Sequence, residues 1–303
     1  MMQQRTLRKT YTFEGKGLHT GKVAKMILCP SKEDTGIRFC RTDIGENAIV
    51  RALASNVTNT ARSTTISENG VDVITVEHVL SAMAGLGIDN VLIKIDNAEV
   101  PILDGSAKPY VDAICADGLE ILDAQRKYIT LDKEIVVTDE EKGVKIVITP
   151  SEETSFDSLI DFNSAVLGVQ KAHWDASMDY AKEIGSCRTF VFFHEVEALC
   201  KMGLIKGGDV ENAIVIVENP VTDEQLENMS AVFNVPKLER KENGYLSNVQ
   251  LRFPNECARH KLLDLMGDMM LCGGFLKASV KAEKSGHRMN TQAAKAVLAA
   301  ISK

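Results

Sequence analysis

The chain has 303 residues, of which 45% are hydrophobic and 25% are charged, and its formal net charge is -7. This is the composition of a globular protein long enough for two cores of about 130 to 150 residues each. A negative balance gives no broad basic face for a nucleic acid, so we expect no DNA or RNA partner. No run reaches the roughly 18 apolar residues of a membrane span, and no apolar stretch follows the charged start, so we expect a cytoplasmic protein.

The seven cysteines are scattered and mostly lie in apolar stretches. An odd number without regular spacing does not indicate a disulfide framework. The sequence has no CxxC pair, which excludes a zinc site built from such thiolates. Any bound metal is therefore expected to use histidine and carboxylate ligands.

The first part of the chain is predicted to be rich in strands. We expect strands over residues 10–13, 23–29, 37–41 and 90–95. Apolar residues at three- and four-residue spacing predict a helix that begins near Thr75, its possible N-cap, and is stopped by Gly85 and Gly87. After a loop at residues 101–105, a short helix is predicted over residues 110–116.

The polar segment at residues 123–132 is the predicted domain boundary, with one α+β domain at residues 1–126 and a second at 127–303. In the second domain we expect strands over residues 142–150, 157–162, 213–218 and 275–283, and a helix over residues 255–270 with Asn255 as a possible N-cap. The polar segment at 219–248 is predicted to be a surface insertion with one helix over Asp223–Phe233.

Two helical segments resemble each other. When HVLSAMAG, from His78, is laid over HKLLDLMG, from His260, the histidine matches, as do the leucine two residues later and the glycine seven residues later. In both segments a strand is expected next. The match is short, but it predicts that the two halves are copies of one unit.

The second of these helices carries a polar stripe. At about 100° per residue, His260, Asp264 and Asp268 fall on one side with Lys261 at its edge. A histidine and a carboxylate at i and i+4 can point at one metal ion. The alternative is an amphipathic helix whose polar stripe faces water, and for an isolated HxxxD pattern this alternative is the more common.

The pair Glu77-His78 stands at the start of the other helix. His78 could be a third metal ligand, while Glu77 could hold a water beside the metal without ligating it. Three protein ligands leave a position open for catalysis. The alternative is a solvated pair favoured by the helix dipole.

The remaining histidines are expected at varied positions. His287 follows a strand through a Ser-Gly turn and is expected on a loop, where Asp268 could keep it protonated for stabilising an oxyanion or protonating a leaving amine. His19 lies between glycines and could line a site or complete a turn. We expect His173 and His194 to be structural or solvated.

Seven segments occur in the order and spacing of one family: GKGLHTG, TVEHVLSAMAGLGIDN, VPILDGSAKP, CRTF, LIKGGD, RHKLLDLMGD and KSGH. From about residue 4 to its end the chain resembles the UDP-3-O-acyl-N-acetylglucosamine deacetylases, the LpxC family of lipid A biosynthesis in Gram-negative bacteria. The resemblance implies two α+β domains of similar topology, each a β-sheet layered with α-helices, with the active site at their interface. It also implies hydrolysis of the N-acetyl group of UDP-3-O-(3-hydroxyacyl)-N-acetylglucosamine, the committed step, which releases acetate and the free amine.

The resemblance further implies roles for single residues. His78, His260 and Asp264 would bind Zn²⁺, which Fe²⁺ could replace in vivo, and Glu77 would be the general base. His287, oriented by Asp268, would be the electrostatic or general-acid partner, and either it or Glu77 would protonate the leaving amine. Thr189 would polarise the amide carbonyl. The expected substrate contacts are Lys261 at the sugar or diphosphate, Phe190 at the hexosamine, Phe162 at uracil, His19, and Gly207, Gly208, Val210 and Ala213 along an apolar passage for the acyl chain.

The chain departs from the family pattern in two features. The insertion at 219–248 is longer than in most members and resembles the lineage in which the deacetylase is fused to a hydroxyacyl-carrier-protein dehydratase. Because the chain ends at Lys303 without such a module, we expect a stand-alone form or one half of a fusion. The segment ARSTTIS lacks a cysteine that some members carry near the metal, so no thiolate contact is expected.

Two other functions stay open at this point. A related zinc amidohydrolase that acts on another acylated amino sugar would keep every metal ligand and differ only in the acyl passage. A non-catalytic nucleotide-sugar binder would be free to lose some of the site residues, yet all of them are present. The sequence does not indicate an oligomeric state.

Overall fold

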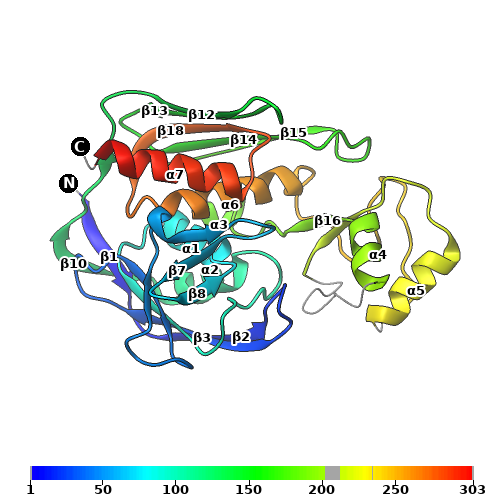
Figure 1. Cartoon of the computed structure of the whole chain (residues 1–303), viewed down its shortest axis with the longest axis horizontal. Helices are drawn as coiled ribbons and strands as arrows, with labels where there is room; N and C mark the ends of the chain where they lie inside the picture. The colour runs from blue at the N-terminus through cyan, green and yellow to red at the C-terminus, as the bar shows by residue number, and fades with distance from the viewer. Residues whose placement is uncertain (1, 202–211, 234, 302–303) are drawn as a thin grey trace.

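The computed structural model describes residues 2–201, 212–233 and 235–301. The main body stacks two β-sheets with a double layer of helices between them (Figure 1). Helices α6 (Glu256–Met270) and α7 (His287–Ile301) pack on one sheet, and α1 (Glu77–Leu86) and α2 (Lys108–Asp117) lie toward the other. Within the described ranges, no helix has the length and apolar character needed to cross a membrane.

The two sheets share one topology. The first has the order β2-β3-β9-β4-β5, and the second has the order β12-β13-β18-β14-β15. In each sheet the last strand in sequence lies in the centre, antiparallel to the second strand and parallel to the third. Each central strand also follows a helix, α1 or α6, that carries one of the matched histidines. The predicted fold of two α+β units with similar topology is therefore confirmed.

The strands of the two sheets have the following bounds. The first contains β2 (Tyr11–Lys16), β3 (Val23–Pro30), β4 (Ile37–Arg41), β5 (Ile49–Arg51) and β9 (Val91–Ile95). The second contains β12 (Ile135–Asp139), β13 (Val144–Pro150), β14 (Ser155–Asp161), β15 (Val169–Asp175) and β18 (Leu276–Glu283), with β11 (Ile129–Thr130) paired to the start of β18.

Smaller elements complete the main body. Strand β1 (Gln3–Leu7) pairs with β10 (Leu119–Gln125). A three-stranded sheet is formed by β6 (Val57–Asn59), β7 (Thr65–Glu68) and β8 (Val71–Ile74), next to the short helix η1 (Ala54–Asn56), and α3 (Tyr180–Glu183) contacts α1. Strand pairing passes from the first half to the second between Gln125 and Ile129. We propose this interval, which contains the predicted boundary at 126/127, as the division between the two domains.

Helix α1 forms where the apolar spacing predicts it, but its ends differ from the prediction. Thr75 is not the N-cap: its backbone is left-handed (φ 61°) and its hydroxyl donates to Glu99 at 3.1 Å. The helix ends at Gly87, whose positive φ of 72° lets its N–H bond the last carbonyls. Gly85 does not end the helix but lies inside it. A side chain is excluded at this position because the ring of Tyr180 occupies the space where a Cβ would stand.

Helix α6 begins one residue after Asn255, which has the N-cap position without capping through its side chain. The Asn255 amide instead donates to the carbonyl of Lys171 at 2.8 Å and accepts from Arg259 at 3.0 Å. Almost every residue of α6 is buried, because the helix is covered by α1 on one side and by α7, β14 and β15 on others. Its polar stripe therefore faces protein rather than water.

A smaller lobe, residues 190–248 within the described ranges, projects from one end of the main body (Figure 1). It contains β16 (Phe190–Phe192), α4 (Phe193–Lys201), β17 (Ile214–Ile216) and α5 (Asp223–Phe233). The predicted helix of the insertion is confirmed with these bounds. The lobe has a hydrophobic core of its own: Phe193, Val196, Val215, Val217, Leu226, Met229, Leu238 and Leu246.

Candidate metal centre and active site

Two histidines and one carboxylate converge where α1 meets α6. His78 is the second residue of α1, and α6 supplies His260 and Asp264 one turn apart. The Nε2 atoms of His78 and His260 lie 3.6 Å and 3.4 Å from Oδ1 of Asp264. All three ligand atoms lie within 4.8 Å of one another. The predicted ligand set is thus brought together from both halves of the chain.

The chemistry of this trio fits a metal ion. Oδ1 of Asp264 is buried and has no hydrogen-bond partner among the described residues. Burial lowers the pKa of His260 to about 3, so its imidazole is neutral, as a metal ligand must be. Nδ1 of His260 lies 3.1 Å from the carbonyl oxygen of Cys187, which can only accept, so Nε2 is left free for a metal. Two imidazole nitrogens and a carboxylate oxygen are a donor set that zinc prefers.

The solvated alternatives for these motifs are excluded by burial. His260 and Asp264 are each 1% exposed, and the side chains of Glu77 and His78 are nearly as inaccessible. The second oxygen of Asp264, Oδ2, accepts from Nζ of Lys261 at 2.8 Å. The carboxylate is therefore paired on one oxygen and open, toward the two histidines, on the other.

Glu77 stands beside the trio. Its Oε2 accepts the backbone N–H of Thr64 at 3.0 Å, and its Oε1 lies 3.8 Å from Nε2 of His287. Burial raises the pKa of Glu77, although His287 and His78 act in the opposite direction. A carboxylate with a raised pKa at the edge of a metal site is suited to accept a proton from water.

His287 is the first residue of α7, not part of a loop as the sequence predicts. The Ser-Gly turn ends the strand, and the helix begins at once because the N–H groups of Met289 and Asn290 bond the carbonyl of Gly286. Nδ1 of His287 is 3.0 Å from Oδ2 of Asp268. Burial alone would lower the pKa of His287, but the carboxylates of Asp268 and Glu77 raise it to about 9. The imidazole is therefore protonated at neutral pH.

Sequence reasoning missed two partners of Asp268. The hydroxyl of Thr64 donates to its Oδ1 at 2.6 Å, and the amide of Asn290 donates to its Oδ2 at 3.0 Å. Asn290 lies three residues after His287 on one face of α7, so it could have been found only with a helix predicted at His287. Thr64 could not, because more than two hundred residues separate it from Asp268.

A cavity of about 650 Å³ opens over the trio. Its lining includes every described residue that the sequence predicts at the site apart from the fully buried Asp268: Glu77, His78, Thr189, Phe190, Phe162, Ala213, His19, His260, Lys261, Asp264 and His287. Arg62, which the sequence did not single out, lines it as well. Gly207, Gly208 and Val210 lie outside the described residues, so their place in the apolar passage stays a prediction.

Aromatic rings and an imidazole form one wall of the cavity. The ring of Phe190 lies 6.4 Å from that of His260 and 5.4 Å from that of Phe162, and Nζ of Lys261 stands 5.5 Å over it. Elsewhere in the lining, Nε2 of His19 is buried without a hydrogen-bond partner among the described residues, and burial lowers the pKa of this imidazole. The wall offers apolar faces, and His19 offers one neutral polar atom.

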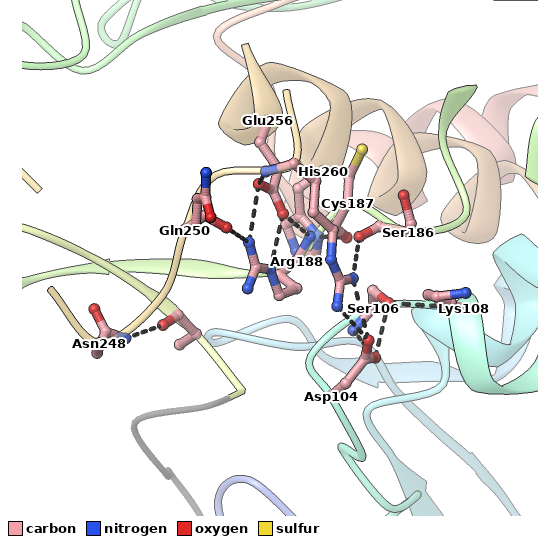
Figure 2. Close-up of polar contacts among 12 residues, drawn as sticks. Asp104, Ser106, Lys108, Ser186, Cys187, Arg188, Asn248, Gln250, Glu256 and His260 are labelled. Carbon is pink, nitrogen blue, oxygen red and sulfur yellow. Dashed lines mark hydrogen bonds and ion pairs between the residues drawn. The ribbon is translucent and has the colours of Figure 1, made fainter. Parts of the chain in front are cut away.

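The segment that carries Thr189 is held by a polar network (Figure 2). The guanidinium of Arg188 bonds Glu256, at the start of α6, at 2.9 Å and the carbonyl of Gln250 at 2.6 Å. The backbone N–H of Thr189 donates to the carbonyl of Gly105 at 2.9 Å. This network joins the loop after β9 to the start of α6, and it fixes the backbone at Arg188 and Thr189.

A buried His-His-Asp trio beside a glutamate and a protonated histidine, set between two α+β units, is the arrangement of a metal-dependent hydrolase. A sequence model of the family described as UDP-3-O-acyl N-acetylglycosamine deacetylase, LpxC, matches residues 4–231 and 238–299. The chain belongs to this family.

Curated relatives agree with this assignment. The bifunctional enzymes LpxC/FabZ of Porphyromonas gingivalis and Bacteroides thetaiotaomicron are each 39% identical, over 98% and 97% of this chain and 64% of their own length. The UDP-3-O-acyl-N-acetylglucosamine deacetylase of Saccharophagus degradans is 39% identical over 96% of this chain and 89% of its own. The chain thus spans less than two thirds of the bifunctional relatives.

Proposed function

We propose that this chain hydrolyses the N-acetyl group of UDP-3-O-(3-hydroxyacyl)-N-acetylglucosamine, which releases acetate and the free amine in the committed step of lipid A biosynthesis. One observation carries the proposal: the buried, unpartnered Oδ1 of Asp264 faces Nε2 of both His78 and His260 at the floor of a large cavity. Family membership and the names of the relatives supply the substrate.

His78, His260 and Asp264 would hold the metal, which we propose to be Zn²⁺, with Fe²⁺ as an ion that could replace it in vivo. When bound, such an ion lowers the pKa of water and polarises a carbonyl oxygen.

The other residues carry the proton transfers. Glu77 takes a proton from the attacking water, whose oxygen adds to the acetamide carbon. The imidazolium of His287 and the hydroxyl of Thr189 stabilise the carbonyl oxygen as it becomes negative, and Asp268 orients His287. The C–N bond then breaks, and the amine leaves with a proton from His287 or from Glu77.

Substrate contacts are part of the same proposal. Phe190 would pack on the hexosamine, Phe162 would stack on uracil, and His19 would offer its free Nε2. Lys261 can contact the sugar or diphosphate while it remains paired with Asp264, because an ammonium group has three donors. Ala213 would line the acyl passage together with Gly207, Gly208 and Val210.

We place the reaction in the cytoplasm. The buried cysteines of the described residues are free thiols, and free thiols are typical of a reducing compartment.

The test combines acetate release with metal analysis. Glu77→Ala should keep its metal and lose about 10²- to 10⁴-fold in turnover, whereas His78→Ala should lose the metal. Full activity of Glu77→Ala would overturn the mechanism. Comparing substrates with and without the 3-O-acyl chain separates the proposed function from a related amidohydrolase, and binding without any acetate release would indicate a non-catalytic binder.

A further inference from the structure

The cavity does not stop at the metal ligands but extends into the lobe. On that side its lining is mostly apolar, and its polar members are Asn212 and Glu195, whose carboxylate accepts the N–H of Phe192 at 3.3 Å. Apart from Phe190, Phe192 and Ala213, six apolar residues of the lobe line it: Val191, Val196, Val215, Met229, Phe233 and Leu246. All six belong to the separate core of the lobe or pack against it.

The two-stranded sheet of the lobe separates two hydrophobic cores. Strands β16 and β17 run parallel with Val191 opposite Val215. Because side chains alternate along a strand, these two valines face the core of the lobe, whereas Ile214 and Ile216 face the main core. The cavity is lined both by Phe190 and Phe192, which pack against the main core, and by the two valines. It therefore passes from the catalytic groups into the core of the lobe.

Helix α5 supplies the wall on the lobe side. Leu226, Met229 and Phe233 recur at three- and four-residue spacing and so share one face of the helix. Met229 is 3% exposed and Phe233 is half-buried, and both line the cavity, whereas Leu226 packs in the same core without reaching it. All three lie in the insertion at residues 219–248.

Hydrogen bonds fix the insertion in place. The Gln225 amide donates to Glu197 of α4 at 3.0 Å, and the N–H of Leu246 donates to the carbonyl of Val215 at 2.9 Å. The hydroxyl of Ser230 accepts the N–H of Leu238 at 2.9 Å, which ties the returning chain to α5. Met229 and Phe233 are thus held on an anchored helix, and a ligand in the cavity meets a defined wall.

We propose that α5 determines which acyl chains the enzyme accepts, with Met229 and Phe233 setting the length that fits. The inference rests on the proposed function, which brings a 3-O-acyl chain to the cavity. An alkyl chain gains about fourfold in affinity for each methylene that it buries against apolar walls. The kcat/KM should therefore rise with acyl-chain length until the chain meets α5. It should fall for longer chains, because adding atoms to a filled hydrophobic core causes strain.

The test measures kcat/KM for acetate release over a series of UDP-3-O-acyl-N-acetylglucosamines that differ by two carbons. Met229→Ala and Phe233→Ala should move the optimum to longer chains by two carbons or more, and Met229→Phe should move it to shorter ones. Leu226→Ala is the matched control: it removes apolar atoms from the same helix and core without enlarging the cavity, so the optimum should stay unchanged. Thermal denaturation checks that each variant is folded, and Phe233→Leu replaces any alanine variant that is not.

Binding of the same series to the Glu77→Ala background gives a readout independent of turnover, and the same shifts are expected there. Acetate release with one length profile in all variants would overturn the inference and leave the proposed function standing. A wild type that binds the series with the predicted length dependence but releases no acetate would overturn the proposed function alone.

Discussion

Asp268 shows how much one buried side chain organises at this site. It is fully buried, and it accepts hydrogen bonds from Thr64, His287 and Asn290. Thr64 lies in the segment before α1, and His287 and Asn290 lie in α7. Because Asp268 itself belongs to α6, one carboxylate aligns three segments. It also provides the charge that keeps His287 protonated, although it is not itself a metal ligand.

We predict that Asp268→Asn lowers turnover by about 10- to 100-fold and leaves the metal content unchanged. An amide has nearly the same size, but it lacks the negative charge that favours the imidazolium of His287. Acetate release and metal analysis on the same sample measure both quantities. Asn290→Ala, which keeps the charge, should cost less. Loss of metal from Asp268→Asn would show that this residue supports the metal ligands instead.

A second residue prediction concerns the pH dependence of stability and the exposed His173 of β15, at the edge of the second sheet. His173 lies between Asp157 and Asp175, at 2.9 Å and 3.2 Å. Partial burial lowers its pKa, but the bonds to both carboxylates outweigh this and raise it. Since the folded-state pKa exceeds the unfolded one, the stabilisation is complete below about pH 6.5 and is lost as pH rises through the folded-state pKa.

His173→Gln should therefore lower the free energy of unfolding at pH 5.5 and have no such effect at pH 9. The loss should be small, because solvent screens an exposed ion pair. Urea denaturation at the two pH values measures it. An equal loss at both would mean that packing, not charge, is the contribution of His173.

At the scale of elements, the close approach of α6 to α1 depends on Gly267. A Cβ at this position would stand 2.0 Å from the backbone oxygen of Glu77. The absence of a side chain lets the two helices come close enough for His260 and Asp264 to face His78. Gly267 matches Gly85 in the sequence repeat, and Gly85 also lies in a close contact, against Tyr180.

Gly267→Ala should destabilise the fold and weaken metal binding. In an exposed helix this change would stabilise by about 1 kcal/mol. Here the added methyl group meets backbone, and overpacking costs about 1–3 kcal/mol, so destabilisation should prevail. Gly274→Ala is the control, because its Cβ would meet only ordinary contacts beginning at 3.6 Å. Denaturation and metal titration of both variants measure the difference; an unchanged metal affinity in Gly267→Ala would contradict the role of helix spacing.

The sequence predicts those helices and strands whose formation depends on residues close together in the chain. The helix over Asp223–Phe233 and the apolar periodicity of α6 follow from spacing that neighbours in the chain determine. Strand β1 is not among the predicted strands, because its partner β10 lies more than a hundred residues away in the sequence. The sequence predicts a helix end at Gly85, because a glycine that terminates a helix and one that makes room for an aromatic ring look alike in sequence.

The residues of the candidate site also fall into two groups, those that local spacing predicts and those that depend on contacts between distant parts of the chain. Helical spacing placed His260, Asp264 and Asp268 on one stripe, but spacing cannot tell a stripe that faces water from one that faces a second helix. That distinction depends on where α1 packs, and so on contacts between residues about 180 positions apart. Thr64 and the Arg188–Glu256 pair belong to the same long-range class.

At the scale of the whole molecule, the two halves meet near the segment that leads to Thr189, and the buried pair of Arg188 and Glu256 fixes this segment to the start of α6 within the second half. Arg188 is 6% exposed and Glu256 is 1% exposed. Nearby, Arg252 binds the carboxylate of Asp104 in the first half at 3.1 Å and the carbonyl of Ser186 in the second. Arg252 therefore connects the two halves. Arg188 anchors the segment of the second half that leads to Thr189 (Figure 2).

Arg188→Met should cost about 3–5 kcal/mol of unfolding free energy, because it leaves the buried charge of Glu256 unpaired. Arg188→Lys should recover only part, since an ammonium cannot reproduce the guanidinium fork. The double change Arg188→Met with Glu256→Leu should recover most of the loss. Removing the more exposed pair Arg51–Glu68 is the control and should cost little. Chemical denaturation measures the free energy of unfolding of all four variants. A double variant whose loss equals the sum of the losses of the two single changes would contradict the pairing.

The matched histidines have a further consequence. His78 and His260 are equivalent residues of two copies, and their rings contact each other with centroids 5.1 Å apart. Equivalent residues meet in this way only close to the axis that relates the copies. A symmetric arrangement can supply metal ligands only in identical pairs, such as the two histidines. The third metal ligand and the general base must therefore lie at positions where the two copies differ. Asp264 stands where the first copy has Ala82, and Glu77 stands where the second has Arg259. These two departures make the site asymmetric, so an asymmetric substrate can bind productively in only one orientation.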